Sequence, residues 1–308
     1  MKYLIIGAGG TGGSLAAYLA QGGHDVTLIA RGRHLEALRA GGLRMETPHR
    51  GDFTLPLPAF AMDGYEGSPD VILQCVKGYS VASTIPFIRR VARADTAIIP
   101  ILNIFGVGGR MQAELPGLFV LDGCMYVTAS IKEPGIVQMH DKLMRVVFGP
   151  RRPEEFRPVL TAIADDMKNC GIAAVLSDNI RRDTMRKFSF ISALASCGLF
   201  YDAPAAAVRA GEQREMFSGL VREMAAVAAA MDIPLPEDIL AINLKVLEGL
   251  PPDMLTSLQR DVAQDHPSEI DGLVFEPLRM GAAAGVPMPL YAEIAAKFGF
   301  APEGTVDK

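Results

Sequence analysis

The chain has 308 residues, 49% of them hydrophobic, and a formal net charge of −5 at pH 7. This length is sufficient for two domains with separate cores. The negative charge, together with the lack of basic runs, argues against a nucleic-acid partner. The N-terminal residues enter an apolar segment without a basic leader, and no apolar run reaches the ~18 residues of a membrane span. We therefore expect a cytoplasmic protein without a membrane anchor.

The first elements of the chain form an informative series. Tyr3–Ile6 predicts a strand, Ser14–Gln21 a helix and Val26–Ala30 a second strand. Between the first strand and the helix lies the pattern Gly-x-Gly-x-x-Gly, formed by Gly7, Ala8, Gly9, Gly10, Thr11 and Gly12. In this context the pattern predicts a dinucleotide site, because glycines permit a tight turn and let backbone N–H groups approach a pyrophosphate. We therefore predict that all six residues bind a cofactor.

The residue after the second strand distinguishes the two nicotinamide dinucleotides. An NAD site usually has an acid there, which binds the ribose 2′-hydroxyl, whereas an Arg accommodates a 2′-phosphate. This chain has Arg31 and then Arg33, with no acid between Thr27 and Leu35. Because guanidinium groups bind phosphate in a bidentate manner, the sequence predicts NADPH. The alternative is that Arg31 is a solvated loop cation.

Strands and helices continue to alternate through the first half, which is typical of a mostly parallel sheet. The further predicted strands are 71–76, 97–102, 118–125, 146–149 and 173–176. Residues 43–60 alternate polar and apolar positions and predict an antiparallel segment rather than another βα unit. A hairpin of 126–132 and 136–142 is predicted around the turn Glu133-Pro134-Gly135, and 153–169 predicts a helix.

From residue 179 onward the periodicity is helical. The predicted helices are 179–200, 203–231, 237–247, 253–264, 269–284 and 290–298. The expected fold is an α/β Rossmann-type domain at 1–177, which binds NADP, and an all-α domain at 178–308, which holds the substrate. The helix at 203–231 has an apolar stripe that predicts core packing, with a homodimer face as the alternative; it consists of Val221, Met224, Ala225 and Ala228.

Two polar residues follow strands that point toward the predicted cofactor. Lys77 comes after strand 71–76, and Asn103 comes after strand 97–102. Ligands of open α/β sheets bind beyond the carboxyl ends of the strands. Each residue alone fits an ordinary polar loop, but together they favour contacts with the cofactor ribose or the substrate.

Lys187, in the helical half of the chain, has two possible interpretations. Lys187 opens an otherwise apolar helical run, where desolvation would lower its pKa and suit it to general-acid work. Alternatively, its stem packs while the ammonium reaches water, and composition alone slightly favours this reading. Glu269 reads as an ordinary acid in the first turn of a helix.

The cysteines and histidines predict no metal site. Neither type has metal-ligand spacing, so we expect free thiols and surface or structural histidines; these residues are Cys75, Cys124, Cys170, Cys197, His24, His34, His49, His140 and His266.

The chain resembles the ketopantoate reductase (2-dehydropantoate 2-reductase) family over essentially its whole length. The motifs that carry the resemblance are the Gly7–Gly12 turn, Arg31, Val76-Lys77, Asn103, Met185-Arg186-Lys187, Thr256-Ser257-Leu258-Gln259-x-Asp261 and Ser268-Glu269-Ile270-Asp271. It implies an NADPH-dependent Rossmann domain joined to a helical domain like that of 6-phosphogluconate dehydrogenase, and reduction of a 2-oxo acid.

The resemblance also implies a role for each candidate residue. Lys187 would be the general acid that protonates the alkoxide as hydride reaches the ketone. Glu269 would bind the new hydroxyl and help to hold Lys187. Ser257 would bind the substrate carboxylate, and Lys77 and Asn103 would position cofactor and substrate.

Several substrate-reading positions depart from the family pattern. Ile191, Ala195 and Met254 stand where the family usually has asparagine, and the usual Asn-Gly reads Asn103-Ile-Phe-Gly106. A site that loses such hydrogen bonds discriminates a polyhydroxylated acid less well. A less polar 2-oxo acid, another ketone or an opine-type compound is therefore an alternative substrate. A non-catalytic NADPH-binding sensor is the alternative from a different functional class.

Overall fold

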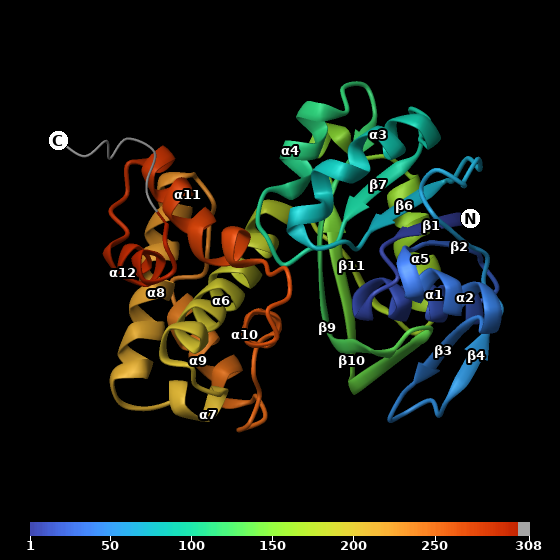
Figure 1. Ribbon diagram of the computed structural model, residues 1–308. Coiled ribbons are helices and arrows are strands. Elements are labelled where there is room, and N and C mark those ends of the chain that lie inside the picture. The colour runs from blue at the N-terminus through green and yellow to red at the C-terminus, as the bar shows by residue number, and fades with distance from the viewer. Residues whose placement is uncertain (301–308) are drawn as a thin grey trace. The chain divides into compact units, whose positions relative to one another are not determined.

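The computed structural model describes residues 1–300. The chain forms two compact units, Met1–Thr184 and the part that begins at Met185, and the division falls within helix α6 (Ile180–Tyr201) (Figure 1). The observed combination of an α/β unit and a helical unit confirms the predicted fold class. No helix within residues 1–300 is long and apolar enough to cross a membrane.

A six-stranded parallel sheet forms the centre of the first unit. Its strands are, in spatial order, β5 (Ala59–Phe60), β2 (Asp25–Ile29), β1 (Lys2–Ile6), β6 (Val71–Gln74), β7 (Ala97–Pro100) and β8 (Phe119–Val120). The central strands are nearly continuous hydrophobic runs because parallel sheets are covered on both faces. Leu4 and Ile72 pack with α3 (Val81–Val91) and α4 (Val107–Glu114), whereas Ile5 and Leu73 face the opposite core, which includes α1 (Gly10–Gln21).

A second sheet packs beside α1 and contains the predicted hairpin. Its strands are β11 (Ala173–Leu176), β10 (Ile136–Gly149), β3 (Leu43–Glu46), β4 (Phe53–Leu55) and β9 (Asp122–Glu133). The hairpin pairs β9 with β10 in antiparallel fashion around the predicted turn, with Gly135 at φ +82°. The helices α2 (Gly32–Gly41) and α5 (Val159–Asn169), with the short turns η1 (Gly78–Ser80) and η2 (Pro153–Glu155), complete the unit.

Four predictions for this unit are wrong in detail. Residues 146–149 continue the hairpin strand β10 rather than forming another strand of the parallel sheet. The excursion at 43–60 is antiparallel for β3 and β4, but β5 returns to pair in parallel with β2. The segment 118–125 divides between β8 and β9, which belong to different sheets. The helix expected over 153–169 begins at Val159, because η2 ends at Glu155 and Phe156 is extended.

The second unit is helical, as predicted. After α6 its elements are α7 (Ala205–Val208), α8 (Gly211–Ala230), α9 (Ile239–Glu248), α10 (Ser257–Ala263), the π-helical η3 (Asp271–Phe275), α11 (Glu276–Ala284) and α12 (Pro289–Lys297). The apolar stripe of α8 lies in the core, where Val221, Met224 and Ala228 are fully buried. This burial supports the core interpretation over the dimer face.

Three predicted helices of this unit have different bounds. The segment 203–231 breaks into α7 and α8 at Gly211, which has φ +58°. The expected helix 253–264 begins only at Ser257, because Thr256 caps it: the Thr256 Oγ1 accepts from the Gln259 N–H at 3.2 Å. The segment 269–284 contains the π-helical η3 before α11, and Pro277 lies at the start of α11.

Candidate functional site

The glycine turn lies at the carboxyl end of β1, with Gly9 as the cap of α1. Gly7 has φ +97°, and a Cβ on Gly12 would lie 2.0 Å from the Gly7 carbonyl oxygen. A side chain at either position would therefore disrupt the turn. A Cβ on Gly9 would meet no heavy atom within 4 Å, so its side of the turn is open to a ligand. This combination of a tight turn and an accessible helix N-terminus fits a dinucleotide pyrophosphate.

The strand ends beside this turn carry the two predicted polar residues. Lys77 lies three residues beyond β6, and Asn103 lies three residues beyond β7. Because β1, β6 and β7 are parallel neighbours, their carboxyl ends share one edge of the sheet. Both side chains are half-buried. The first unit thus brings the glycine turn, Lys77 and Asn103 to one edge.

Arg31 lies at the position expected for selection of the dinucleotide. It is exposed and caps α2, two residues beyond the end of β2 at Ile29. The turn of backbone after it depends on Gly32, which has φ +56°. An exposed guanidinium next to a helix N-terminus suits an anionic group such as a phosphate.

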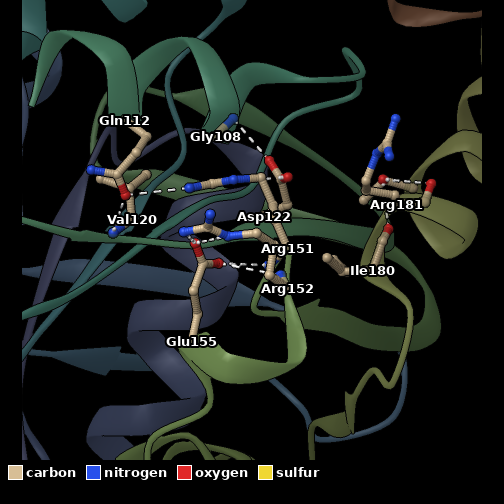
Figure 2. A network of polar contacts seen from close by, with 10 residues as sticks. Gly108, Gln112, Val120, Asp122, Arg151, Arg152, Glu155, Ile180 and Arg181 are labelled. Atoms are coloured by element: carbon tan, nitrogen blue, oxygen red, sulfur yellow. Dashed lines mark hydrogen bonds and ion pairs between the residues drawn. The ribbon is translucent and has the colours of Figure 1, made fainter. Parts of the chain in front are cut away.

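A buried polar network supports the loop that follows Asn103, and the sequence interpretation missed it (Figure 2). Asp122 Oδ1 accepts a hydrogen bond from the Gly108 N–H at 2.9 Å. Gly108 is closely packed, because a Cβ at this position would lie 2.0 Å from the Leu121 carbonyl oxygen. Arg151 Nη1 lies 4.0 Å from Asp122 Oδ2, and Arg151 Nη2 donates to Gln112. Burial raises the pKa of Asp122, and the Arg151 charge opposes this effect. The network fixes the start of α4.

The predicted chemical residues of the second unit are buried. Lys187 and Glu269 are each only 6% exposed. This leaves little of the Lys187 surface for water, contrary to the snorkelling alternative. Charged side chains at such positions need close polar partners, because isolated burial of a charge is costly. Glu269 lies at the entrance to η3, not in the first turn of an ordinary helix.

The elements that carry Lys187 and Glu269 are linked through Ser192. Pro277 has no N–H, so in a regular helix the carbonyl of Leu273 would lack its partner. The Ser192 hydroxyl, on α6, donates to this Leu273 oxygen at 2.7 Å and also contacts the Tyr291 hydroxyl at 2.7 Å. At this contact the backbone forms the π-helical η3, in which the Glu276 N–H binds the Asp271 carbonyl oxygen, and π-helical turns are often found near functional sites. The contact thereby joins α6 to η3 at Leu273, four residues after Glu269.

Ser257 and the positions that depart from the family pattern also lie in the second unit. Ser257 is the first residue of α10 and is half-buried. Ala195 is 1% exposed, whereas Ile191 is half-buried on the same helix. Met254 is half-buried, and its carbonyl oxygen accepts from the Ala205 N–H at 3.0 Å.

His34 is a second residue whose position the sequence did not reveal. Its ring binds the backbone of Ala8 in the glycine turn and of Gly135 in the hairpin. The prediction of a surface or structural histidine gave no sign of this contact, because Gly135 is 101 residues away in the chain.

The comparisons with family models, curated proteins and solved structures point to the same family. The model of ketopantoate reductase PanE/ApbA matches residues 3–153, and the model of its C-terminal part matches residues 179–299. The uncharacterized oxidoreductase YkpB of Bacillus subtilis is 25% identical over 96% of this chain and 98% of its own. The 2-dehydropantoate 2-reductase of Mesorhizobium japonicum is 28% identical over 94% of each chain. The structure of a PanE/ApbA family ketopantoate reductase from Ralstonia eutropha has a TM-score of 0.88 at 26% identity, covering 96% of this chain and 97% of that one.

Proposed function

Because the chain belongs to the ketopantoate reductase family of NADP-dependent oxidoreductases that act on CH–OH groups, we propose that it reduces a 2-oxo acid with NADPH. The reaction has the form of the conversion of 2-dehydropantoate to pantoate. The observation that carries this proposal is that Lys187 and Glu269 are both buried, and that the Ser192–Leu273 hydrogen bond joins the helix of Lys187 to the segment that follows Glu269. Buried ionisable groups of this kind are typical of sites of proton transfer.

The residues of the first unit would hold the cofactor. Residues Gly7 to Gly12 would bind the pyrophosphate through backbone N–H groups, and Arg31 would bind the 2′-phosphate. Lys77 and Asn103, at the neighbouring strand ends, would contact the ribose or the substrate. NADPH, when bound, supplies the hydride that forms the new C–H bond at the carbonyl carbon.

Lys187 would supply the proton that the reduction needs. As negative charge develops on the carbonyl oxygen, the Lys187 ammonium gives up one N–H proton and the oxygen becomes a hydroxyl. The resulting neutral amine then takes a proton from solvent. Glu269 would accept a hydrogen bond from the product hydroxyl and help to orient the lysine, and Ser257 would donate to the substrate carboxylate.

A less polar substrate is a specific alternative to 2-dehydropantoate. Ile191, Ala195 and Met254 offer no side-chain amide to the hydroxyl groups of that acid. Apolar groups at these positions favour an apolar chain on the 2-oxo acid, because they impose no penalty for missing hydrogen bonds. The two substrates share the same hydride and proton chemistry and differ only in recognition.

Oxidation of NADPH with a panel of carbonyl compounds tests the proposal. The panel contains 2-dehydropantoate, unbranched and aromatic 2-oxo acids, and 2-oxo acids with an amine as opine precursors. Turnover of a 2-oxo acid without an amine, which is lost in Lys187→Met, supports the proposed reaction. Turnover that requires the amine would instead support an opine-type substrate. Rapid turnover of 2-dehydropantoate alone would exclude the less polar substrate. Binding of NADPH with no oxidation by any member would instead support a sensor.

A further inference from the structure

The His34 ring lies between the glycine turn and the hairpin of the first unit. One ring nitrogen, Nε2, is 2.8 Å from the Ala8 carbonyl oxygen. The other, Nδ1, is 3.0 Å from the Gly135 backbone nitrogen. A single half-buried side chain therefore connects the turn after β1 with the turn between β9 and β10.

The partners of His34 determine its tautomer. A backbone N–H can only donate, so Nδ1 must accept from Gly135 and carries no proton. Nε2 then carries the ring proton and donates it to the Ala8 carbonyl oxygen. Burial lowers the pKa of His34, an effect that opposes the influence of the Ala8 hydrogen bond and favours the neutral ring. The same arrangement could not form with an imidazolium, because both nitrogens would donate.

Close backbone packing places the glycine turn against the same hairpin. A Cβ on Gly10 would lie 2.3 Å from the Ala129 carbonyl oxygen of β9, and a Cβ on Gly13 would lie 2.7 Å from a Val137 methyl group of β10. The start of α1 is thus packed against both strands, and His34 provides a directional hydrogen bond at the edge of this contact.

We propose that His34 is a positioning residue for the cofactor, acting through the peptide group between Ala8 and Gly9. In a trans peptide the C=O and N–H bonds point in opposite directions. A carbonyl held toward His34 therefore directs the Gly9 N–H away from the His34 ring. The backbone at Gly9 is also open to a ligand, because a Cβ there would meet no heavy atom within 4 Å. The inference rests on the proposed function, because it assumes that the turn binds a dinucleotide pyrophosphate.

Three variants of His34 separate its two hydrogen bonds. His34→Gln retains an N–H donor near the position of Nε2, whereas His34→Asn retains an acceptor near Nδ1 and loses the Ala8 contact. The dissociation constants of NADPH and NADH are measured by titration for each variant. We expect His34→Ala and His34→Asn to weaken both cofactors by the same factor of about ten, as one lost hydrogen bond predicts. His34→Gln should remain within about twofold of the wild type.

The equal effect on both cofactors distinguishes this role from that of Arg31. NADPH and NADH share the pyrophosphate, so a change in the turn affects both, whereas Arg31→Ala should weaken NADPH alone. The value of kcat at saturating cofactor should change less than twofold in the His34 variants. His49→Ala is the matched control, because His49 also binds a residue of α1, the Tyr18 hydroxyl, but lies away from the glycine turn.

Three results would overturn the inference. The first is unchanged affinity in His34→Ala. The second is equal weakening in His34→Gln and His34→Ala, since His34→Gln keeps the donor to Ala8. The third is a lower kcat at unchanged affinity. If the wild type binds neither dinucleotide, the proposed function itself fails. If the wild type binds NADPH and the His34 variants bind it equally well, only the inference about His34 fails.

Discussion

At the scale of single residues, Lys187 gives the sharpest test of the chemistry. Lys187→Met removes the proton donor but keeps an unbranched apolar stem in the buried position. We expect hydride transfer to slow at least about a hundredfold, the usual contribution of a general acid, while NADPH affinity is unchanged. Single-turnover measurements with the best substrate of the panel report this rate. Lys245→Met, at an exposed lysine of α9, should behave as wild type; equal rates in both variants would exclude Lys187 as the acid.

The buried pair of Asp122 and Arg151 leads to a prediction about stability. Their side chains are 11% and 16% exposed, so removal of either charge leaves the other desolvated. Asp122→Leu should lower the free energy of unfolding by about 3 kcal/mol, whereas the double variant with Arg151→Met should recover part of that loss. Urea denaturation measures both. Glu154→Ala, which removes an exposed partner of Arg152, should cost less than about 1 kcal/mol. Additive effects of Asp122→Leu and Arg151→Met would show that the two residues are not coupled.

At the scale of elements, Ser192 should matter because Pro277 cannot donate to Leu273. Ser192→Ala leaves a buried carbonyl without its donor and should lower the free energy of unfolding by about 1–3 kcal/mol. Ser192→Thr, which keeps a hydroxyl, should lose less. Denaturant unfolding gives the comparison, with Ser83→Ala as a control because Ser83 is exposed and bonds within its own turn. A loss in Ser83→Ala as large as that in Ser192→Ala would contradict this account of η3.

The same elements explain what sequence patterns could and could not predict. The strands beside the glycine turn are predictable because their apolar runs and turn glycines are local signals. The prediction for α10 begins four residues early because it follows periodicity alone, although the capping box of Thr256 and Gln259 is a local signal of the true start. The donor to the Leu273 carbonyl of η3 is Ser192, which lies 81 residues away in the chain. Such a contact has no signature within a local window.

The candidate site shows the same limit. The glycine turn, Arg31, Lys77 and Asn103 follow strands directly, so their common edge can be inferred from strand order. His34 and Asp122 resemble ordinary loop and strand residues in the sequence. Their importance depends on Gly135 and Gly108, which tertiary packing brings to them. The residues proposed to bind directly are thus easier to predict than those proposed to orient them.

At the scale of the whole molecule, α6 belongs to both compact units, because it begins before their division and continues to Tyr201. A continuous helix predicts that the two units unfold together. The Cys197 thiol, which is fully buried and donates to the Gln213 carbonyl oxygen, reports on the second unit. Burial raises its pKa to about 12, so little reactive thiolate exists in the folded chain at pH 8. Alkylation of Cys197 should therefore require unfolding.

The pH dependence of this thiol has a definite sign. Its pKa in the folded chain exceeds the ordinary 9.0, so the unfolded chain releases the proton first as the pH rises. The contribution of the thiol to stability is complete below pH 9 and is lost as the pH approaches about 12. Alkylation at pH 8 is therefore free of this effect and measures unfolding alone.

Cofactor binding to the first unit should consequently protect a thiol in the second. NADP⁺ at a hundred times its dissociation constant lowers the unfolded population about a hundredfold if the whole chain unfolds as one. We expect the rate of Cys197 alkylation to fall by the same factor, when refolding is faster than alkylation. NADH, which lacks the phosphate proposed to bind Arg31, should protect less at equal concentration. Full protection of Cys170 in the first unit without protection of Cys197 would show that the units unfold independently despite sharing α6.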